Sequence, residues 1–312
     1  MNQLEFSDLA PLAILERAGL NESFHNGVAV LLDSQGKVIE SHGNVRKPIY
    51  PRSALKPVQA LAMRQAGLNL QDQLLVISMA SHQGTDGHTQ LVSQVLAEVG
   101  LNTSDLQCPR AFPGNPDSRA KSNEMSRVAM NCSGKHAGFL ATCQLNGWDL
   151  ETYLHPDHPL QVRIQQLVEE LAEERVSAVT ADGCGAPLFA ISTEGLAKAF
   201  AAVGRLAPEM IQAAKNSPWV IGDKGAPDAV FLEHGLFAKI GAEGVFVVTT
   251  DSHEAVAIKI ADGNLRAAPV VAAKLLHNHD LISNDAFESL VDRLSPKVMG
   301  GDSVTGNLLL TV

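Results

Sequence analysis

Short apolar runs separated by turn residues mark both ends of the chain. Residues 27–33 lead through Ser-Gln-Gly into residues 37–40, and this arrangement predicts a β-hairpin. Near the C-terminus, residues 243–250 and 254–262 form another pair of apolar runs and predict a second hairpin. Strand-forming sequence therefore occurs at both ends of the chain.

Between the hairpins, apolar residues recur mainly at the spacing of one helix face. We expect a helix from just after Ser53 to about Gly67, whereas the Pro, Asn and Ser residues of 105–130 predict a long loop. The run 74–80 is short and mostly apolar, which favours a buried strand. Further helices are predicted at 91–100, 134–147 and 160–171, twice within 193–214, and at 268–277 and 284–293.

Hairpins at both ends with helices between them favour an α+β fold. We expect a mixed sheet built from both termini, from about residues 10–50 and 230–312, beside a central helical lobe of about residues 51–229. No repeat, low-complexity tract or linker-like segment divides the chain. Residues 1–312 are therefore predicted to form a single domain with two lobes.

Composition and charge narrow the class of protein. The 312 residues are 45% hydrophobic and 19% charged, which is typical of a globular protein with a buried core. The formal net charge of -10, without a Lys/Arg cluster, argues against nucleic acids and anionic membranes as partners. Four widely spaced cysteines, no signal-peptide pattern at the start and no membrane-length apolar run favour a cytoplasmic location.

A serine followed three residues later by a lysine stands at the start of the first predicted helix. Residues three apart share a helix face, so Ser53 and Lys56 can meet. A serine nucleophile needs a base, and a lysine is one when burial or another cation lowers its pKa. Pro57 cannot donate to the Ser53 carbonyl, so either the first turn is irregular or the regular helix begins at Pro57. Alone, this pattern also fits an N-cap serine before a surface lysine.

Four further stretches concentrate polar or reactive side chains beside small residues. Residues 81–84 follow the predicted buried strand, and 131–138 combine a thiol, a hydroxyl, an amine and an imidazole. Residues 182–187 set a carboxylate beside Gly-Cys-Gly, which could bind an ammonium group, and 239–244 place a lysine before small residues that let a substrate approach. Singly, the first, second and fourth stretches also fit a polar turn, a buried small-residue corner and a surface lysine.

Together these stretches resemble the rhizobial-type L-asparaginase II family. The order and spacing match between about residue 16 and about residue 272, and the segments beginning at Asn131 and Asp182 are the most specific. The resembling segments are 52–57, 80–82, 131–138, 153–159, 182–187 and 239–244. The resemblance implies a fold similar to serine-dependent β-lactamases and glutaminases, and hydrolysis of asparagine to aspartate and ammonia. It also implies a small amide substrate and a homo-oligomer, such as a homodimer.

The resemblance assigns catalytic roles by position. Ser53 would be the nucleophile and Lys56 its base, while Ser81 and Lys239 would form a second serine–lysine pair. Two lysines in one pocket repel each other, so Lys56 can be neutral near pH 7 and take the proton of Ser53. Ser81 would pass the proton to the leaving ammonia. Backbone N–H groups of Ser53 and of a residue just after Lys239 would hold the oxyanion.

The same resemblance suggests substrate-binding and metal-binding residues. Charge complementarity favours Arg52 or His136 for the substrate α-carboxylate and Asp182 for its α-ammonium group. The chemistry itself requires no cofactor, but a zinc site is implied. The residues that would surround the zinc are Cys132, Lys135 and Cys184.

Two places depart from the family pattern. A glycine and a histidine are expected after the loop cysteine Cys108, where this chain has Pro109 and Ala111. An acidic residue is expected after Ser-His-x-Gly, where this chain has Thr85. Both differences bear on substrate choice and metal affinity.

Three alternative functions stay open at this level. A β-lactamase-like or peptidase-like serine hydrolase would share Ser53, Lys56 and a strand lysine. A glutaminase is equally compatible, because one methylene is worth only about 1–3 kcal/mol in a pocket. A non-catalytic amino-acid-binding module would leave the amide intact.

Overall fold

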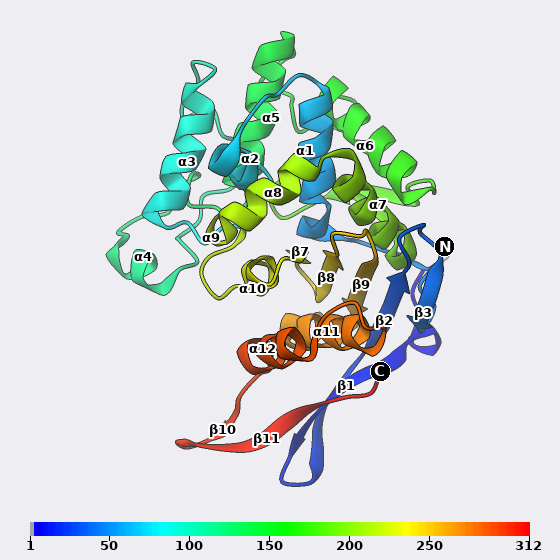
Figure 1. Cartoon of the computed structure of the whole chain (residues 1–312). Helices are drawn as coiled ribbons and strands as arrows, with labels where there is room; N and C mark the ends of the chain where they lie inside the picture. The colour runs from blue at the N-terminus through cyan, green and yellow to red at the C-terminus, as the bar shows by residue number, and fades with distance from the viewer. Residues whose placement is uncertain (1–2) are drawn as a thin grey trace.

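The computed structural model describes residues 3–312 and has three layers (Figure 1). A large sheet separates a lobe of helices from two helices on its other face, α11 (Ala268–Asn278) and α12 (Asn284–Leu294). Its strands follow the order β10-β11-β1-β2-β9-β8-β7, with β3 also paired to β2. Their bounds are β1 Ala10–Arg17, β2 Leu20–Leu32, β3 Val38–His42, β7 Phe237–Gly241, β8 Val245–Thr249, β9 Ala255–Ile260, β10 Val298–Gly300 and β11 Ser303–Leu310.

The central strands are apolar on both faces because both faces of the sheet are covered. In β2, Val28, Val30 and Leu32 face the core under the helical lobe, whereas Ala29 and Leu31 face the core under α11 and α12. The same alternation holds in β8 and β9. A sheet buried on both sides reads as a continuous apolar run rather than as an apolar–polar alternation. The position of the sheet between two cores thus follows from these runs.

The helical lobe packs on one face of this sheet. Its helix α7 (Thr193–Leu206) lies against β2, β8 and β9, and Phe200 stacks on Phe237 of β7 at 4.8 Å between ring centroids. The other helices of the lobe are α1 Lys56–Gln65, α2 Asp72–Ser78, α3 Asp86–Ala97, α4 Pro116–Lys121, α5 Ser133–Asn146, α6 Pro159–Ala172, α8 Pro208–Asn216, α9 Pro218–Ile221 and α10 Pro227–Glu233. A short 3-10 turn, η2 (Arg52–Leu55), precedes α1.

A small second sheet joins the two lobes. It has the order β4-β6-β5, formed by β4 (Pro48–Ile49), β6 (Pro187–Ser192) and β5 (Ala178–Ala181). All residues of β6 are buried and all of β5 are exposed. This sheet ties the segment before Ser53 to the segment that carries Asp182.

Much of the predicted organisation is confirmed. The fold is α+β, and β1 pairs with β11, so both termini do build the main sheet. Both hairpins are present, as β2 with β3 and β8 with β9. Each predicted helix is also present, close to its expected bounds, as α1, α3, α5, α6, α7, α8, α11 and α12.

Three predictions are wrong in detail. Residues 74–80 belong to helix α2 and the turn after it, not to a strand. This helix is packed against α3, α5, α8 and α9, so it has little polar face from which a helical period could be read. Residues 105–130 contain the short helix α4, begun by Pro116 and capped by Asn115. The main sheet is not mixed, since each strand pair described in residues 3–312 is antiparallel.

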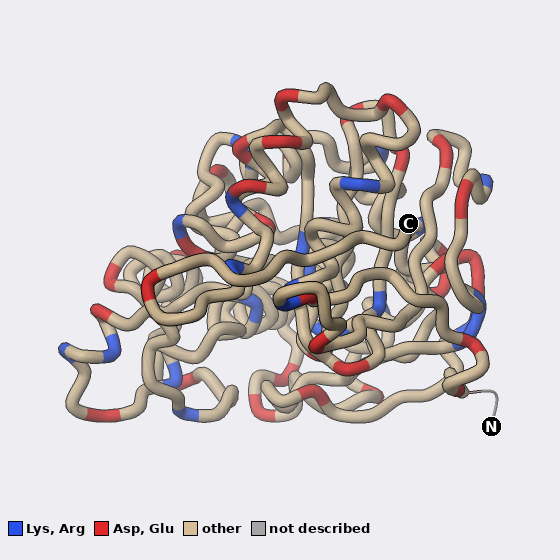
Figure 2. The backbone as a smooth tube through the Cα atoms, turned by 90° about the horizontal axis from the view of Figure 1, so that it is seen from below, with Lys and Arg blue, Asp and Glu red and all other residues tan. Residues whose placement is uncertain are grey.

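Charged positions are interspersed along the backbone. In the view from below, both acidic and basic positions occur around the outline, and some basic positions lie well inside it (Figure 2). Several of the basic side chains are buried: Lys56, Lys135 and Lys239 are at most 2% exposed. Buried amines of this kind require specific partners.

One glycine sets how closely two helices of the lobe approach. Gly134 lies in the first turn of α5, where an added Cβ would sit 2.1 Å from the carbonyl oxygen of Ile77 in α2. Such contact is impossible for a real side chain. The start of α5, which carries Lys135 and His136, can therefore pack this closely against α2 only because residue 134 is glycine.

We expect Gly134→Ala to destabilise the protein by about 1–3 kcal/mol, because the methyl group must push α5 away from α2. Urea denaturation followed by circular dichroism measures this change. Leu145→Ala, at an exposed position of the same helix, is the matched control and should change the free energy of unfolding by no more than about 0.5 kcal/mol. Equal stability of Gly134→Ala and wild type would contradict the close approach.

Candidate active site

The Ser53 turn is held in an unusual backbone conformation. Arg52 has φ +55°, which is uncommon for a residue other than glycine and is often found where the surrounding structure enforces it. Ser53 follows in the 3-10 turn η2 and is half-buried, and the N–H of Lys56 donates to the Ser53 carbonyl. Of the two alternatives that Pro57 left open, the irregular first turn is the one observed.

The amine of Lys56 is buried and points to oxygen atoms from two other segments. It donates to the Ala80 carbonyl at 2.5 Å, to the Ser81 hydroxyl at 3.0 Å and to the Asn131 carbonyl at 3.4 Å. Burial lowers the pKa of Lys56; the Cys132 side chain opposes this change, and repulsion from Lys239 and Lys135 adds to it. The structure thus brings Lys56 directly to Ser81, one of the predicted site residues.

Lys239 is not paired with Ser81. Its amine, fully buried on β7, donates to the Asp228 carboxylate at 2.8 Å and to the Ile240 carbonyl at 3.4 Å. Lys239 nevertheless lies near enough to lower the pKa of Lys56 by charge repulsion. Sequence reasoning missed Asp228. A lysine within the otherwise apolar run of β7 was a sign that a buried carboxylate must exist elsewhere.

The edge of the main sheet adjoins the Ser53 turn. Strand β7 is the last in the strand order, so its edge opposite β8 has no strand partner within residues 3–312. An added Cβ at Gly241 would lie 2.3 Å from the Pro51 carbonyl, which shows how closely β7 and η2 approach each other. Edge strands carry unpaired N–H and C=O groups at alternate residues. Such groups next to Ser53 can bind a ligand.

Two cysteines and a lysine form a compact buried cluster. Lys135 donates to the sulfur of Cys184 at 3.1 Å. A hydrogen bond from Cys184 holds the pKa of the Cys132 thiol well below its usual range, helped by the charges of Lys56 and Lys135. Donating that bond, together with burial, raises the pKa of Cys184. The cluster thus brings together two sulfurs with oppositely shifted pKa values and an amine that bonds one of them.

This donor set offers zinc three ligands. Thiolates suit zinc, and three protein ligands with an open fourth position are a common zinc arrangement. The lysine would have to give up its proton first, because Lys135 acts as a donor here. Residues 3–312 contain no group of three or more His, Cys, Asp and Glu side chains that could hold a metal ion. The implied zinc site therefore depends on the amine as its third ligand.

Arg52 and Asp182 form an ion pair at the rim of the site. The Arg52 Nε donates to Asp182 Oδ1 at 2.7 Å, and the side chains are 24% and 11% exposed. Burial alone would raise the pKa of Asp182, but hydrogen bonds from Arg52 and the Gly183 N–H and the charge of Lys135 lower it overall. From the sequence, Arg52 is expected to bind the α-carboxylate of the substrate and Asp182 its α-ammonium group. In the structure these two side chains contact each other.

His136 lies deeper than predicted for a residue that contacts substrate. Its ring is fully buried, Nδ1 bonds the Tyr153 hydroxyl at 2.7 Å, and Nε2 has no hydrogen-bond partner among the described residues. Burial lowers the pKa of His136 well below its usual range, as do the charges of Lys135 and Lys56. The ring is therefore neutral.

The two departures from the expected pattern have structural roles. Thr85 caps α3: its side chain accepts from the His88 N–H and bonds the His88 ring at 2.7 Å. Cys108 is buried with its sulfur on the Arg127 carbonyl at 3.4 Å, and Ala111 bridges to Ser126. These contacts order the loop around the site.

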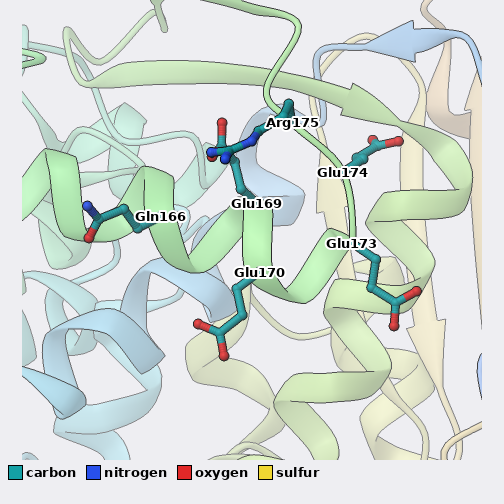
Figure 3. Close-up of a pocket in the computed structure, with 6 residues that line it drawn as sticks. All are labelled: Gln166, Glu169, Glu170, Glu173, Glu174 and Arg175. Carbon is teal, nitrogen blue, oxygen red and sulfur yellow. The ribbon is translucent and has the colours of Figure 1, made fainter.

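A prominent surface hollow lies apart from this chemistry. It is lined by Gln166, Glu169 and Glu170 of α6 and by residues 173–175 after the helix, whose side chains point in several directions (Figure 3). Glu169 is paired with Arg175 at 2.7 Å. None of the predicted catalytic residues lines this hollow, so we do not assign the reaction to it.

A family comparison agrees with the motif analysis. A family model described as L-asparaginase II matches residues 13–309. Among solved structures, the chain is similar to a beta-lactamase from Mycobacterium bovis, with 16% identity, a TM-score of 0.43, and coverage of 81% of this chain and 94% of that one. No curated protein sequence matches. In residues 3–312, no helix is both long and apolar enough to cross a membrane.

The ion pair between Arg52 and Asp182 predicts a pH-dependent contribution to stability. The pKa of Asp182 is lower in the folded state, so its contribution is present above the ordinary carboxyl pKa of about 4 and is lost as the pH falls through the folded value. We expect Asp182→Asn to be less stable than wild type at pH 6, with the difference shrinking below about pH 4. Urea denaturation at several pH values measures this, and a difference that grows on acidification would contradict it.

Proposed function

Because this chain belongs to the L-asparaginase II family, we propose that it hydrolyses the side-chain amide of L-asparagine to L-aspartate and ammonia through a serine-linked acyl-enzyme. The observation that carries the mechanism is the hydrogen bond between the buried amine of Lys56 and the Ser81 hydroxyl. Lys56 itself lies one helical turn after Ser53. This arrangement provides the amine and hydroxyl groups that a serine nucleophile needs for proton transfer.

The first step is attack of the Ser53 oxygen on the carboxamide carbon. A neutral Lys56 has two N–H groups and one lone pair, so one of its three donated hydrogen bonds is given up; the lone pair then accepts the Ser53 proton, directly or through the Ser81 hydroxyl. Burial and the neighbouring cations favour the neutral form of Lys56 because they lower its pKa. The resulting tetrahedral intermediate carries its negative charge on the former carbonyl oxygen.

Backbone groups next to Ser53 are suited to hold that charge. The N–H of Ser53 and an N–H just after Lys239, on the free edge of β7, are the donors that we assign to the oxyanion. When the intermediate collapses, the C–N bond breaks and the proton held by Lys56 and Ser81 passes to the departing ammonia. Water then hydrolyses the ester on Ser53 and restores the hydroxyl.

Arg52 and Asp182 carry the charges that an amino-acid substrate would recognise. Asparagine presents one α-carboxylate and one α-ammonium group, so the ion pair can be exchanged for two new pairs, carboxylate with Arg52 and ammonium with Asp182. His136 was the alternative for the carboxylate. Its complete burial and its bond to Tyr153 favour Arg52 for this role.

We also propose a zinc site, a cytoplasmic location and a homo-oligomeric assembly. The cluster of Cys132, Lys135 and Cys184 would hold a zinc ion, which would fix the start of α5 against the Asp182 loop. The four free, buried cysteines suit a cytoplasmic location. A single catalytic domain, a small amide substrate and a homo-oligomer complete the proposal.

Ser53→Ala should abolish ammonia release, because the proposed acyl-enzyme forms on the Ser53 hydroxyl. Ammonia release is measured with asparagine and with glutamine, and mass spectrometry detects the acylated protein with a slow amide substrate. Ser252→Ala, an exposed serine far along the chain, serves as the control and should retain full activity. Labelling that survives in Ser53→Ala would contradict the assignment. Release from glutamine alone would make the enzyme a glutaminase, and bound asparagine that stays intact would indicate a binding module.

Zinc binding should depend on the thiol cluster. After dialysis against zinc and then buffer, we expect about one zinc per chain in wild type and much less in Cys184→Ser, because the site loses one of its three ligands. Elemental analysis measures the metal content. Cys143→Ser changes a buried cysteine outside the cluster and should retain the zinc. Equal zinc in wild type and Cys184→Ser would exclude this site.

A further inference from the structure

Asp228 is a charged group that no part of the proposed mechanism yet uses. Its carboxylate lies 2.8 Å from the amine of Lys239, and neither side chain has any exposed surface. A buried charge is tolerated only with a partner, so each of these groups depends on the other. Asp228 stands in the first turn of α10, whereas Lys239 comes from β7. The ion pair therefore joins a helix of the lobe to the edge strand of the sheet.

The two lysines of the site have partners of different kinds. Lys239 donates to a carboxylate, which fixes a positive charge on its amine. Lys56 donates to the Ala80 and Asn131 carbonyls and to the Ser81 hydroxyl, and it also interacts with the Cys132 sulfur, but none of these partners is a carboxylate. Such an amine can lose its proton at lower cost than one that would leave a carboxylate unpaired. The arrangement distinguishes the two amines.

The segment that leads into Asp228 also holds Ser81. The N–H of Ser81 donates to the Ile221 carbonyl at 2.8 Å. The next residue, Gly222, packs on Asp228 so closely that an added Cβ would lie 2.8 Å from Oδ1. Ser81 and Lys239 are thus positioned by a single stretch, residues 221–228. A shift of the Asp228 carboxylate would therefore displace both Ser81 and the amine of Lys239.

We propose that Asp228 is a positioning residue: it holds Lys239 as a fixed cation beside the Ser53 turn and so leaves Lys56 as the amine that accepts the proton. The inference rests on the proposed function, since it assigns a division of labour within that reaction. Lys239 then stabilises developing negative charge and does not itself act as the base. Asp228 acts only through Lys239 and contacts no reacting atom.

The first test is the kinetics of Asp228→Asn. We expect kcat for ammonia release to fall about 10- to 100-fold with KM changed by less than about threefold, because Lys239 is lost from the reacting step and not from substrate binding. Asp228→Glu keeps the charge and should recover part of the loss. A rise in KM at unchanged kcat would overturn the proposal, because it would place Asp228 in substrate binding.

A double-mutant cycle shows whether Asp228 acts through Lys239. In a Lys239→Met background, Asp228→Asn should cause no further loss of kcat. The double variant also removes both buried charges, so it remains informative if Asp228→Asn alone does not fold. An equal loss from Asp228→Asn in both backgrounds would contradict the proposal.

The rate at which a serine-reactive phosphonate labels Ser53 separates this inference from the proposed function. The labelling requires no amide substrate and should slow in Asp228→Asn by about the same factor as kcat. Absence of ammonia release by wild type would reject the proposed function, whereas unchanged labelling in Asp228→Asn would reject this inference. Asp292→Asn removes an exposed carboxylate on α12 and is the matched control, expected to match wild type.

Discussion

The burial of three lysine amines is the constraint on which the site depends. Lys56, Lys135 and Lys239 are at most 2% exposed and lie close enough together for their charges to interact. The amines differ in their main partners: carbonyl and hydroxyl oxygens for Lys56, the Cys184 sulfur for Lys135 and a carboxylate for Lys239. Like charges in a poorly solvated region are costly, so the fold must supply these partners at fixed positions. The helices and strands around the site are arranged so that they do.

Those partners come from segments far apart in the chain, which explains the role of the two-lobed architecture. Lys56 starts α1, its acceptors follow α2 and precede α5, and Lys239 lies on the edge strand β7. The sheet is covered on both faces, and its last strand β7 packs against the Ser53 turn. Close approaches at glycine, such as Gly241 against Pro51, bring the two lobes together. The site is therefore a product of packing between lobes.

Local pattern was enough to predict most elements and the motif residues, but not their pairings. The helical spacing of apolar residues in α6 and the apolar runs of β8 and β9 are local properties of the sequence, and these elements are predicted correctly. Helix α2 is not, because burial on several sides removes the polar face that reveals a helix. The ion pair of Lys239 with Asp228 joins residues 11 apart whose directions depend on how α10 meets β7. No spacing rule contains that information.

Residues 72–78 form a helix and not the predicted strand, and this helix affects the electrostatics around Lys56. The carbonyl of Ala80 follows the C-terminal end of α2, where unpaired carbonyl groups and the helix dipole are negative. This end favours the protonated amine, as does the Cys132 side chain, whereas burial, Lys239 and Lys135 favour the neutral amine. A base must be neutral at rest and still able to accept a proton during the reaction. Burial and the two lysines favour the neutral Lys56 that can act as a base, while the end of α2 and the Cys132 side chain favour its protonated form during the reaction. Burial alone would favour only the neutral form.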